Sequence, residues 1–288
     1  MPKISRAGDL AGPFPLFAVF SLMAVATGCM IARANGAPTG EWVRNLVAWG
    51  VGAILAGGLS RWAGQRVLLG FWFVAPLALT ATLFGGGQLG VHRWLQLGPL
   101  RMNAAELLLP AGVIACTAIL AVRRPWWGAA GLTLVLLAIQ PDASQATAFG
   151  GALIVLIATA QARRVWRLGG ALLVILAIVA SWLQRDPLAP VADVEGIMRL
   201  AWGMSPIAAV VAWGALAGAV VSPLAALRAP SADLKAAAMA LTAYGALSAL
   251  VPLFGAFPVP LVGMGMSPIL GLWLAIGLLA AIGRRAAP

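Results

Sequence analysis

The sequence predicts an all-α, polytopic membrane protein with about ten transmembrane helices and both termini in the cytoplasm. Composition is the first reason. Hydrophobic residues make up 62% of the 288 residues and charged residues only 9%, whereas soluble domains are about half apolar and about a quarter charged. The apolar residues also form long runs. When these runs are counted as spans, most basic residues fall on one side of the membrane, as expected for cytoplasmic loops.

A membrane helix needs about 20 predominantly apolar residues. Ten segments are candidates, some of them short or containing Gly and Pro: 13–34, 44–61, 66–85, 104–122, 126–140, 144–161, 168–184, 197–222, 234–254 and 266–283. The fifth and sixth are the least distinct, because only Gln140 to Ser144 separate them. No polar interval is long enough for a soluble domain, so we expect residues 1–288 to form a single transmembrane domain.

The charged residues give the orientation of these spans. With a cytoplasmic N-terminus, only two acidic residues, Asp9 and Asp233, fall on the inner side. Basic residues show the opposite bias, which agrees with the positive-inside rule. Thirteen of the 19 basic residues lie inside: Lys3, Arg6, Arg61, Arg66, Arg123, Arg124, Arg163, Arg164, Arg167, Arg228, Lys235, Arg284 and Arg285.

The net charge of +11 does not indicate nucleic-acid binding. The basic residues sit at helix ends, and no aromatic residues alternate with them as in a nucleic-acid surface. We therefore expect the lipid bilayer, and no nucleic acid, around this chain. Cys29 and Cys116 lie in apolar segments without the spacing of a metal or redox site, so no metal site is expected from them.

The remaining polar residues gather in three clusters, all on the outer side in this topology. The first runs from Gly90 to Glu106 and contains Arg93 and Arg101, whose forked guanidinium groups suit phosphate. Asn103 and Glu106 also have the spacing of a capping box, so a helix start explains these two residues equally well. A positively charged, wet site here favours an anionic ligand with its head group at the outer leaflet.

The second and third clusters allow both structural and functional interpretations. Asp142 ends a Gln-Pro-Asp sequence and is followed at the third position by Gln145, a pattern that favours a helix cap. The third cluster, from Asp186 to Arg199, has the densest charge in the chain. In it, Asp193 is either the N-cap of the next helix or a general base beside arginines that hold a phosphate leaving group.

The order of these clusters resembles the SEDS family, the RodA and FtsW type of cell-wall proteins. Residues 90–98 (GVHRWLQLG) are similar to its G-x-x-R-W-(I/L)-x-(L/F)-G segment. Residues 103–106 (NAAE) stand where the family has Q-P-S-E, and residues 140–142 match its Q-P-D. Residues 260–268 (PLVGMGMSP) resemble P-(L/F)-(V/I)-S-Y-G-G-S-S. The resemblance covers roughly residues 70 to 285.

This resemblance implies a peptidoglycan glycosyltransferase of the bacterial cytoplasmic membrane that polymerises lipid II at the outer face. Such an enzyme serves cell elongation or division beside a class B penicillin-binding protein. Asp193 matches the family's essential Asp and would take a proton from the acceptor sugar hydroxyl. A divalent cation, Mg²⁺ or Mn²⁺, could assist, although no acidic pair is clearly spaced for one. The substrate-binding candidates are Arg93, Arg101, Glu106, Asp142 and Arg199.

Departures from the family pattern keep other functions open. The outer loop before Asp193 is much shorter, Leu109 replaces an expected Lys, and residues 263–266 read GMGM instead of S-Y-G-G. These differences favour a non-catalytic, SEDS-like membrane partner that binds lipid II or a cell-wall synthase. A flippase for lipid-linked precursors is a third possibility. It would need polar groups across the bilayer, whereas the mid-span positions are nearly all apolar.

Overall fold

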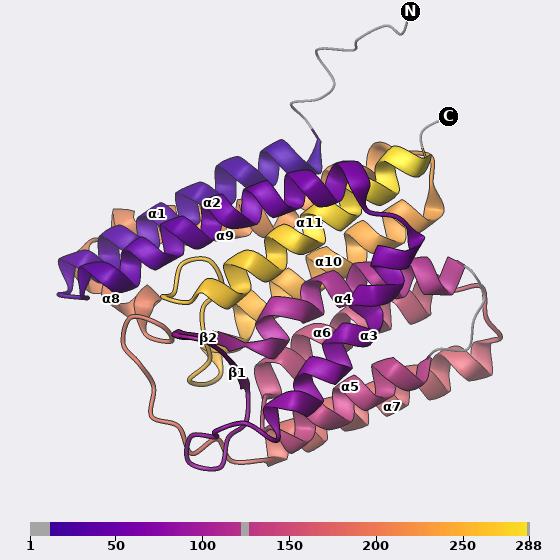
Figure 1. Cartoon of the computed structure of the whole chain (residues 1–288), viewed down its shortest axis with the longest axis horizontal. Coiled ribbons are helices and arrows are strands. Elements are labelled where there is room, and N and C mark those ends of the chain that lie inside the picture. The colour runs from indigo at the N-terminus through magenta and orange to yellow at the C-terminus, as the bar shows by residue number, and fades with distance from the viewer. Residues whose placement is uncertain (1–11, 122–126, 287–288) are drawn as a thin grey trace, which may run out of the picture.

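The computed structural model describes residues 12–121 and 127–286 (Figure 1). The charges Lys3, Arg6, Asp9, Arg123 and Arg124, used above for orientation, lie outside these ranges. Eleven α-helices are present in the described part: α1 Pro13–Ala34, α2 Thr39–Trp62, α3 Gln65–Thr82, α4 Ala104–Ala121, α5 Trp127–Ile139, α6 Ala143–Thr159, α7 Arg164–Leu183, α8 Ile197–Met204, α9 Pro206–Val221, α10 Ala232–Leu250 and α11 Met266–Ala286. Short 3₁₀ segments follow α9 and α10: η2 Ser222–Arg228 and η3 Val251–Leu253.

The helices confirm a polytopic membrane protein. Seven described spans are long and apolar enough to cross a membrane: α1, α2, α3, α7, α9 continued by η2, α10 continued by η3, and α11. Residues 104–117 of α4, together with α5 and α6, are also apolar but shorter. The 13 residues of α5 reach only about 20 Å at the α-helical rise. The count of ten spans and the cytoplasmic location of the termini therefore stay predictions.

The predicted span 197–222 is broken in two. Ser205 is extended, with φ −170° and ψ 136°, and separates α8 from α9. Pro206 at the first position of α9 cannot donate a backbone hydrogen bond, and it disfavours helical dihedrals in the preceding residue. The Ser205 hydroxyl accepts a hydrogen bond from the Ile207 amide, which caps the new helix. One predicted helix thus becomes two, because this local chemistry favours a helix start.

A β-hairpin adds to the predicted all-helical fold. Strands β1 (Trp94–Leu97) and β2 (Leu100–Asn103) pair antiparallel, with Trp94 opposite Asn103. Gly98 has φ +60° and occupies the first position of the two-residue turn, where glycine is favoured. Strand β2 leads directly into α4, so the hairpin places the first polar cluster over the start of that helix.

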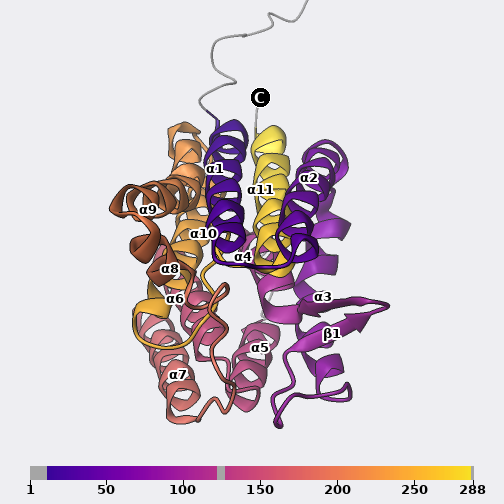
Figure 2. The same ribbon diagram turned by 90° about the vertical axis from the view of Figure 1, so that its left-hand side faces the viewer.

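Helix α11 lies between α1 and α2 in the side view (Figure 2). Its Trp273 is fully buried and packs against Phe14, Phe17 and Trp49, with ring centroids 5.4, 4.9 and 5.5 Å away. Aromatic side chains contribute large buried areas and favour such tilted and edge contacts. This cluster fixes α11 against α1 and α2 and so sets the position of the loop that precedes it.

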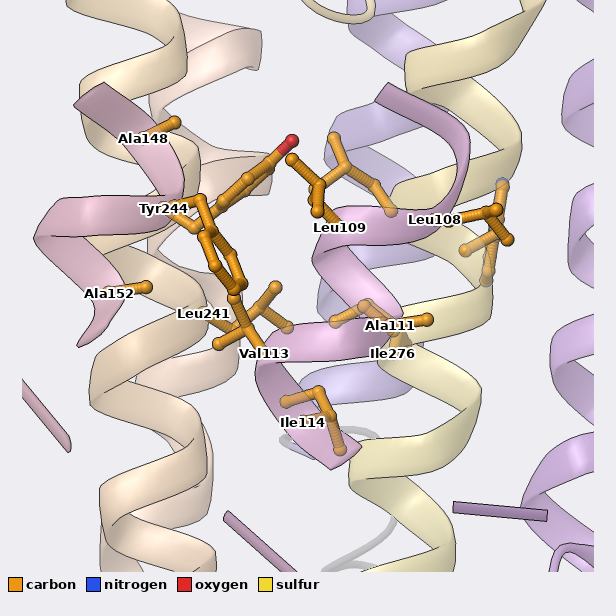
Figure 3. Packing of buried hydrophobic residues seen from close by; sticks show 14 of the residues in the cluster. Leu108, Leu109, Ala111, Val113, Ile114, Ala148, Ala152, Leu241, Tyr244 and Ile276 are labelled. Carbon is orange, nitrogen blue, oxygen red and sulfur yellow. The ribbon is translucent and has the colours of Figure 1, made fainter. Parts of the chain in front are cut away.

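Helix α4 packs against the other side of α11 and against α10 (Figure 3). In the close-up, Leu109 and Val113 of α4 lie near Tyr244 and Leu241 of α10. Where α4 and α11 meet, a Cβ on Gly271 would be only 2.1 Å from the Glu106 carbonyl oxygen, so the contact requires glycine. The close approach brings the N-terminal ends of both helices into one site.

Candidate functional site

A polar cavity of about 260 Å³ is lined in part by the β1–β2 hairpin. Figure 1 shows this hairpin near the start of α11, away from the end of that helix. The cavity is formed by the hairpin, the N-terminal turns of α4 and α6, the α7–α8 connection and the loop before α11. The structure brings parts of all three polar clusters and of the 260–268 motif together here. Four of the predicted site residues line it: Arg93, Arg101, Glu106 and Asp142.

The start of α4 is capped as the sequence predicts. The Asn103 side-chain oxygen accepts hydrogen bonds from the amides of Ala105 (2.9 Å) and Glu106 (3.2 Å). The Asn103 amide itself donates to the hydroxyl of Ser267 in the first turn of α11, at 2.9 Å. Glu106 therefore does not complete a capping box; this residue is 8% exposed and lines the cavity instead.

Arg93 is held by two carboxylates. Its Nη2 atom lies 2.8 Å from Asp186 Oδ2, and its Nε atom lies 3.8 Å from Asp142 Oδ2. The guanidinium also donates to the carbonyl oxygens of Gln140 (3.1 Å) and Pro141. A buried guanidinium needs such partners to offset its lost hydration. Arg93 thus joins the first and second clusters to the α7–α8 connection, and its Nε and Nη2 atoms already have partners.

Asp142 caps α6, which confirms the interpretation that the sequence favoured. Its Oδ1 atom accepts hydrogen bonds from the Gln145 amide (3.2 Å) and the Ser144 hydroxyl (2.9 Å). Its Oδ2 atom faces Arg93. Gln140, two residues before, donates to the Leu79 carbonyl at 2.8 Å and so connects the end of α5 to α3. The Gln-Pro-Asp motif is therefore structural as well as part of the cavity wall.

Arg101 is the lining cation with the most freedom. Its guanidinium lies over the Trp94 ring, 4.3 Å from the centroid, and donates to the Gln88 side-chain oxygen at 3.3 Å. No carboxylate in the described part of the chain pairs with it. Because Arg101 is exposed and lines the cavity, it can receive an anionic group.

Asp193 and Arg199 do not line the cavity. The predicted N-cap role of Asp193 is wrong, because α8 begins only at Ile197, after Gly196. Residues 191–196 instead form a tight turn in which the amides of Val194 and Glu195 donate to the Val191 carbonyl. The Asp193 backbone carbonyl accepts a hydrogen bond from the Met264 amide, and Arg199 is exposed on α8.

Glu195 is the carboxylate of the 191–196 turn that lines the cavity. Its Oε2 atom accepts a hydrogen bond from the Val191 amide at 2.7 Å. Burial raises the pKa of the Glu195 carboxyl, with repulsion from Asp193 and Asp186 adding to the rise and backbone hydrogen bonds opposing it. Sequence analysis assigned Glu195 no role beyond membership of a charged loop.

A side chain of α2 forms hydrogen bonds with the backbone of the loop before α11. The Asn45 side chain donates to the Gly263 carbonyl at 3.0 Å and accepts from the Gly265 amide at 3.1 Å. Asn45 is 1% exposed, and it lies in an apolar helix far from the motifs in sequence. Its polarity within that helix was the only signal for it. Asp186, the closest carboxylate to Arg93, was likewise seen only as part of the third cluster.

Metal ligands do not gather in the described ranges. Across residues 12–121 and 127–286, no three His, Cys, Asp or Glu side chains are grouped so that they could hold an ion.

Comparison with solved structures identifies the fold. A mutant form of the rod shape determining protein RodA of Thermus thermophilus superposes with a TM-score of 0.70 at 20% identity, covering 94% of this chain and 97% of that chain. The chain has the RodA fold. The unmutated RodA of the same organism gives 0.64 at 18% identity with the same coverage. No family model and no curated protein matches the sequence itself.

A third solved structure with a similar fold belongs to a peptidoglycan synthase complex. It comes from work on how this complex coordinates polymerization and crosslinking, and it matches with a TM-score of 0.67 at 22% identity. Coverage is again 94% of this chain and 97% of that chain. The RodA-like polytopic membrane fold predicted from the motifs is thus confirmed, over nearly the whole length of the chain.

Proposed function

We propose that this protein is a peptidoglycan glycosyltransferase that polymerises lipid II at the outer face of the bacterial cytoplasmic membrane. The observation that carries the proposal is the polar cavity in a RodA fold. The cation Arg101 and the carboxylates Glu106 and Glu195 all line this cavity. A class B penicillin-binding protein is the proposed partner. The similarity of this chain to a solved structure from a peptidoglycan synthase complex supports it.

The reaction needs a base and an anion-binding group. A carboxylate accepts the proton of the acceptor sugar hydroxyl, whose oxygen forms the new bond to the donor's anomeric carbon. The bond from that carbon to the pyrophosphate oxygen breaks, and the lipid-linked pyrophosphate leaves with the electron pair. Arg101 is placed to stabilise the developing negative charge, because Arg93 is already paired with Asp142 and Asp186.

We propose that the base comes from the 191–196 turn. The family resemblance assigns it to Asp193, whereas the carboxylate of this turn that lines the cavity is Glu195. A carboxylate with a raised pKa is a stronger base and lies closer to the working pH. We therefore expect Glu195→Gln to lower polymerisation by about 10²–10⁴-fold, and Asp193→Asn to lower it less.

The test is lipid II polymerisation in proteoliposomes that contain the cognate penicillin-binding protein. Glu41→Gln in the first turn of α2 and Asp233→Asn in the first turn of α10 are matched controls outside the cavity. A loss in Asp193→Asn with normal activity in Glu195→Gln would return the base to Asp193. Normal activity in both variants would remove the 191–196 turn from the chemistry.

A second candidate, a non-catalytic partner that binds lipid II or a synthase, is favoured by the size of the cavity. At about 260 Å³ it is smaller than the roughly 300–1,000 Å³ of typical small-molecule sites. Two lipid-linked sugars therefore do not fit inside it unless the surrounding loops move. Lipid II binding by wild-type protein without any polymer would support this candidate over the enzyme.

A further inference from the structure

A second concave region lies far from the site cavity. It is an apolar groove of about 760 Å³ between α5, α6 and α7, which we call the α5–α7 groove. Leu134, Leu153, Ile157 and Val174 contribute to its walls. Helix α7 covers it only loosely, because of its 20 residues just Val174 and Ser181 are buried. Within a bilayer this groove faces hydrocarbon and offers room for an extended apolar chain.

Glycines leave the groove open on two sides. Gly131 of α5 and Gly169 of α7 both line it, and a Cβ built on either residue would meet no atom within 4 Å. Glycine lowers helix stability relative to other residues, so two glycines facing empty space carry a cost without a packing reason. The space they leave is therefore available to a molecule outside the chain.

One end of the groove is positively charged. Arg167, in the first turn of α7, lines it and donates from Nη1 to the Ala158 carbonyl at 3.1 Å. The Arg167 Nε atom is buried and has no hydrogen-bond partner in the described structure. No carboxylate of the described residues pairs with this guanidinium. Arg163 and Arg164 are exposed beside it and add to the positive charge.

Two tryptophans lie at the same end. Trp127 at the start of α5 and Trp166 in the first turn of α7 both line the groove and are 40% and 73% exposed. Tryptophan concentrates at the level of lipid head groups, with arginine beside it. This end therefore lies at the membrane–water interface, and the apolar part of the groove extends from it into the bilayer.

We propose that the α5–α7 groove binds an anionic glycerophospholipid, with one acyl chain between the helices and the phosphate on Arg167. The phosphate oxygens would accept hydrogen bonds from the Arg167 guanidinium, which no described carboxylate pairs with, and Arg163 and Arg164 would add attraction. Basic pockets between membrane helices bind anionic head groups by this chemistry. In the predicted topology the lipid belongs to the cytoplasmic leaflet.

The occupant is a leaflet lipid and not the lipid-linked substrate of the proposed reaction. The charged end of the groove lies at the end of α6 and the start of α7, whereas the site cavity contains Asp142 before α6 and Asp186 after α7. The two therefore open at opposite ends of the same helices. A lipid with its phosphate on Arg167 cannot present its head group to the cavity.

The test is native mass spectrometry of the purified full-length protein titrated with phosphatidylglycerol or phosphatidylcholine. We expect saturable binding of one phosphatidylglycerol and weaker binding of phosphatidylcholine. Arg167→Ala should weaken phosphatidylglycerol binding about fivefold, the effect of one arginine near a membrane surface. It should weaken phosphatidylcholine binding as well, but less, because the choline cation offsets the charge of the phosphate that Arg167 contacts. Arg228→Ala, an exposed arginine outside the groove at the end of η2, is the matched control and should bind as wild type does.

Filling the groove tests its apolar part separately. Gly169→Leu and Gly131→Leu should each reduce binding of both lipids, whereas Gly214→Leu, on the exposed face of α9 with equal free space, should not. Two positions on different helices keep the test valid if one variant does not fold. Equal binding of the two lipids by wild type, or full binding by Arg167→Ala or by a folded groove-filled variant, would overturn the proposal. None of these results depends on polymerisation.

Discussion

Replacing Arg93 by Met should strongly destabilise the protein. The Arg93 side chain is 8% exposed, and its carboxylate partners Asp142 and Asp186 are 3% and 24% exposed. Without the guanidinium, two acidic groups stay close together in a poorly hydrated place and two backbone carbonyls lose a donor. Removing one member of a buried ion pair costs about 3–5 kcal/mol. Because each kcal/mol moves Tm by about 2–4 °C in proteins of roughly this size, we expect a decrease on the order of 10 °C.

The two free cysteines provide the assay. Cys29 and Cys116 are 5% and 2% exposed, so a thiol-reactive fluorescent dye reports their exposure as the purified protein is heated. Asp186→Asn should lower Tm less than Arg93→Met, because Asp142 still faces the guanidinium. Arg101→Met is the control, since an exposed cation–π contact is worth only about 0.5–1 kcal/mol. A Tm for Arg93→Met equal to that of Arg101→Met would refute the role of Arg93 as a buried link.

Three further predictions concern other parts of the site. Asn45→Ala leaves the buried Gly263 carbonyl and the partly buried Gly265 amide of the loop before α11 without partners, so it should cost about 1–3 kcal/mol and lower Tm in the same assay; an unchanged Tm would contradict this. Because folding raises the pKa of Glu195, the folded protein is more stable while this carboxyl group is protonated. The protein loses that stability as the pH rises through the raised pKa. Glu195→Gln should therefore match wild-type Tm at low pH and exceed it increasingly at higher pH, and a difference independent of pH would count against this. Gly271→Ala should cost about 1–3 kcal/mol or prevent folding, since its Cβ meets the Glu106 carbonyl; Gly214→Ala, with free space, should be neutral or stabilising in the same Tm measurement, and equal effects would be inconsistent with the α4–α11 contact.

The membrane class, the helix caps and the short motifs depend on residues close together in the sequence, so they could be predicted from it. Hydropathy indicated the membrane class, since about 20 apolar residues in a row have few other stable locations. Spacing alone offered helix caps as one interpretation of Asn103 and as the favoured one of Asp142, because a cap bonds to amides two or three residues away. The order of four short motifs indicated the RodA-like fold, which the structural comparison confirms at only about 20% identity.

Only the tertiary structure decided which polar groups meet. Two contacts join distant segments of the chain: Arg93 pairs with Asp186, and Asn45 bonds to the loop before α11. Which carboxylate lines the cavity, Glu195 or Asp193, depends on how the 191–196 turn is oriented. Helix patterns do not encode such contacts, since the orientation of a turn follows from what packs against it. The 191–196 turn is held by Met264 and Val259 of the loop before α11, so that loop determines which carboxylate faces the cavity. By itself the sequence therefore determined the membrane fold class and the set of polar residues, and packing between distant helices decided their arrangement.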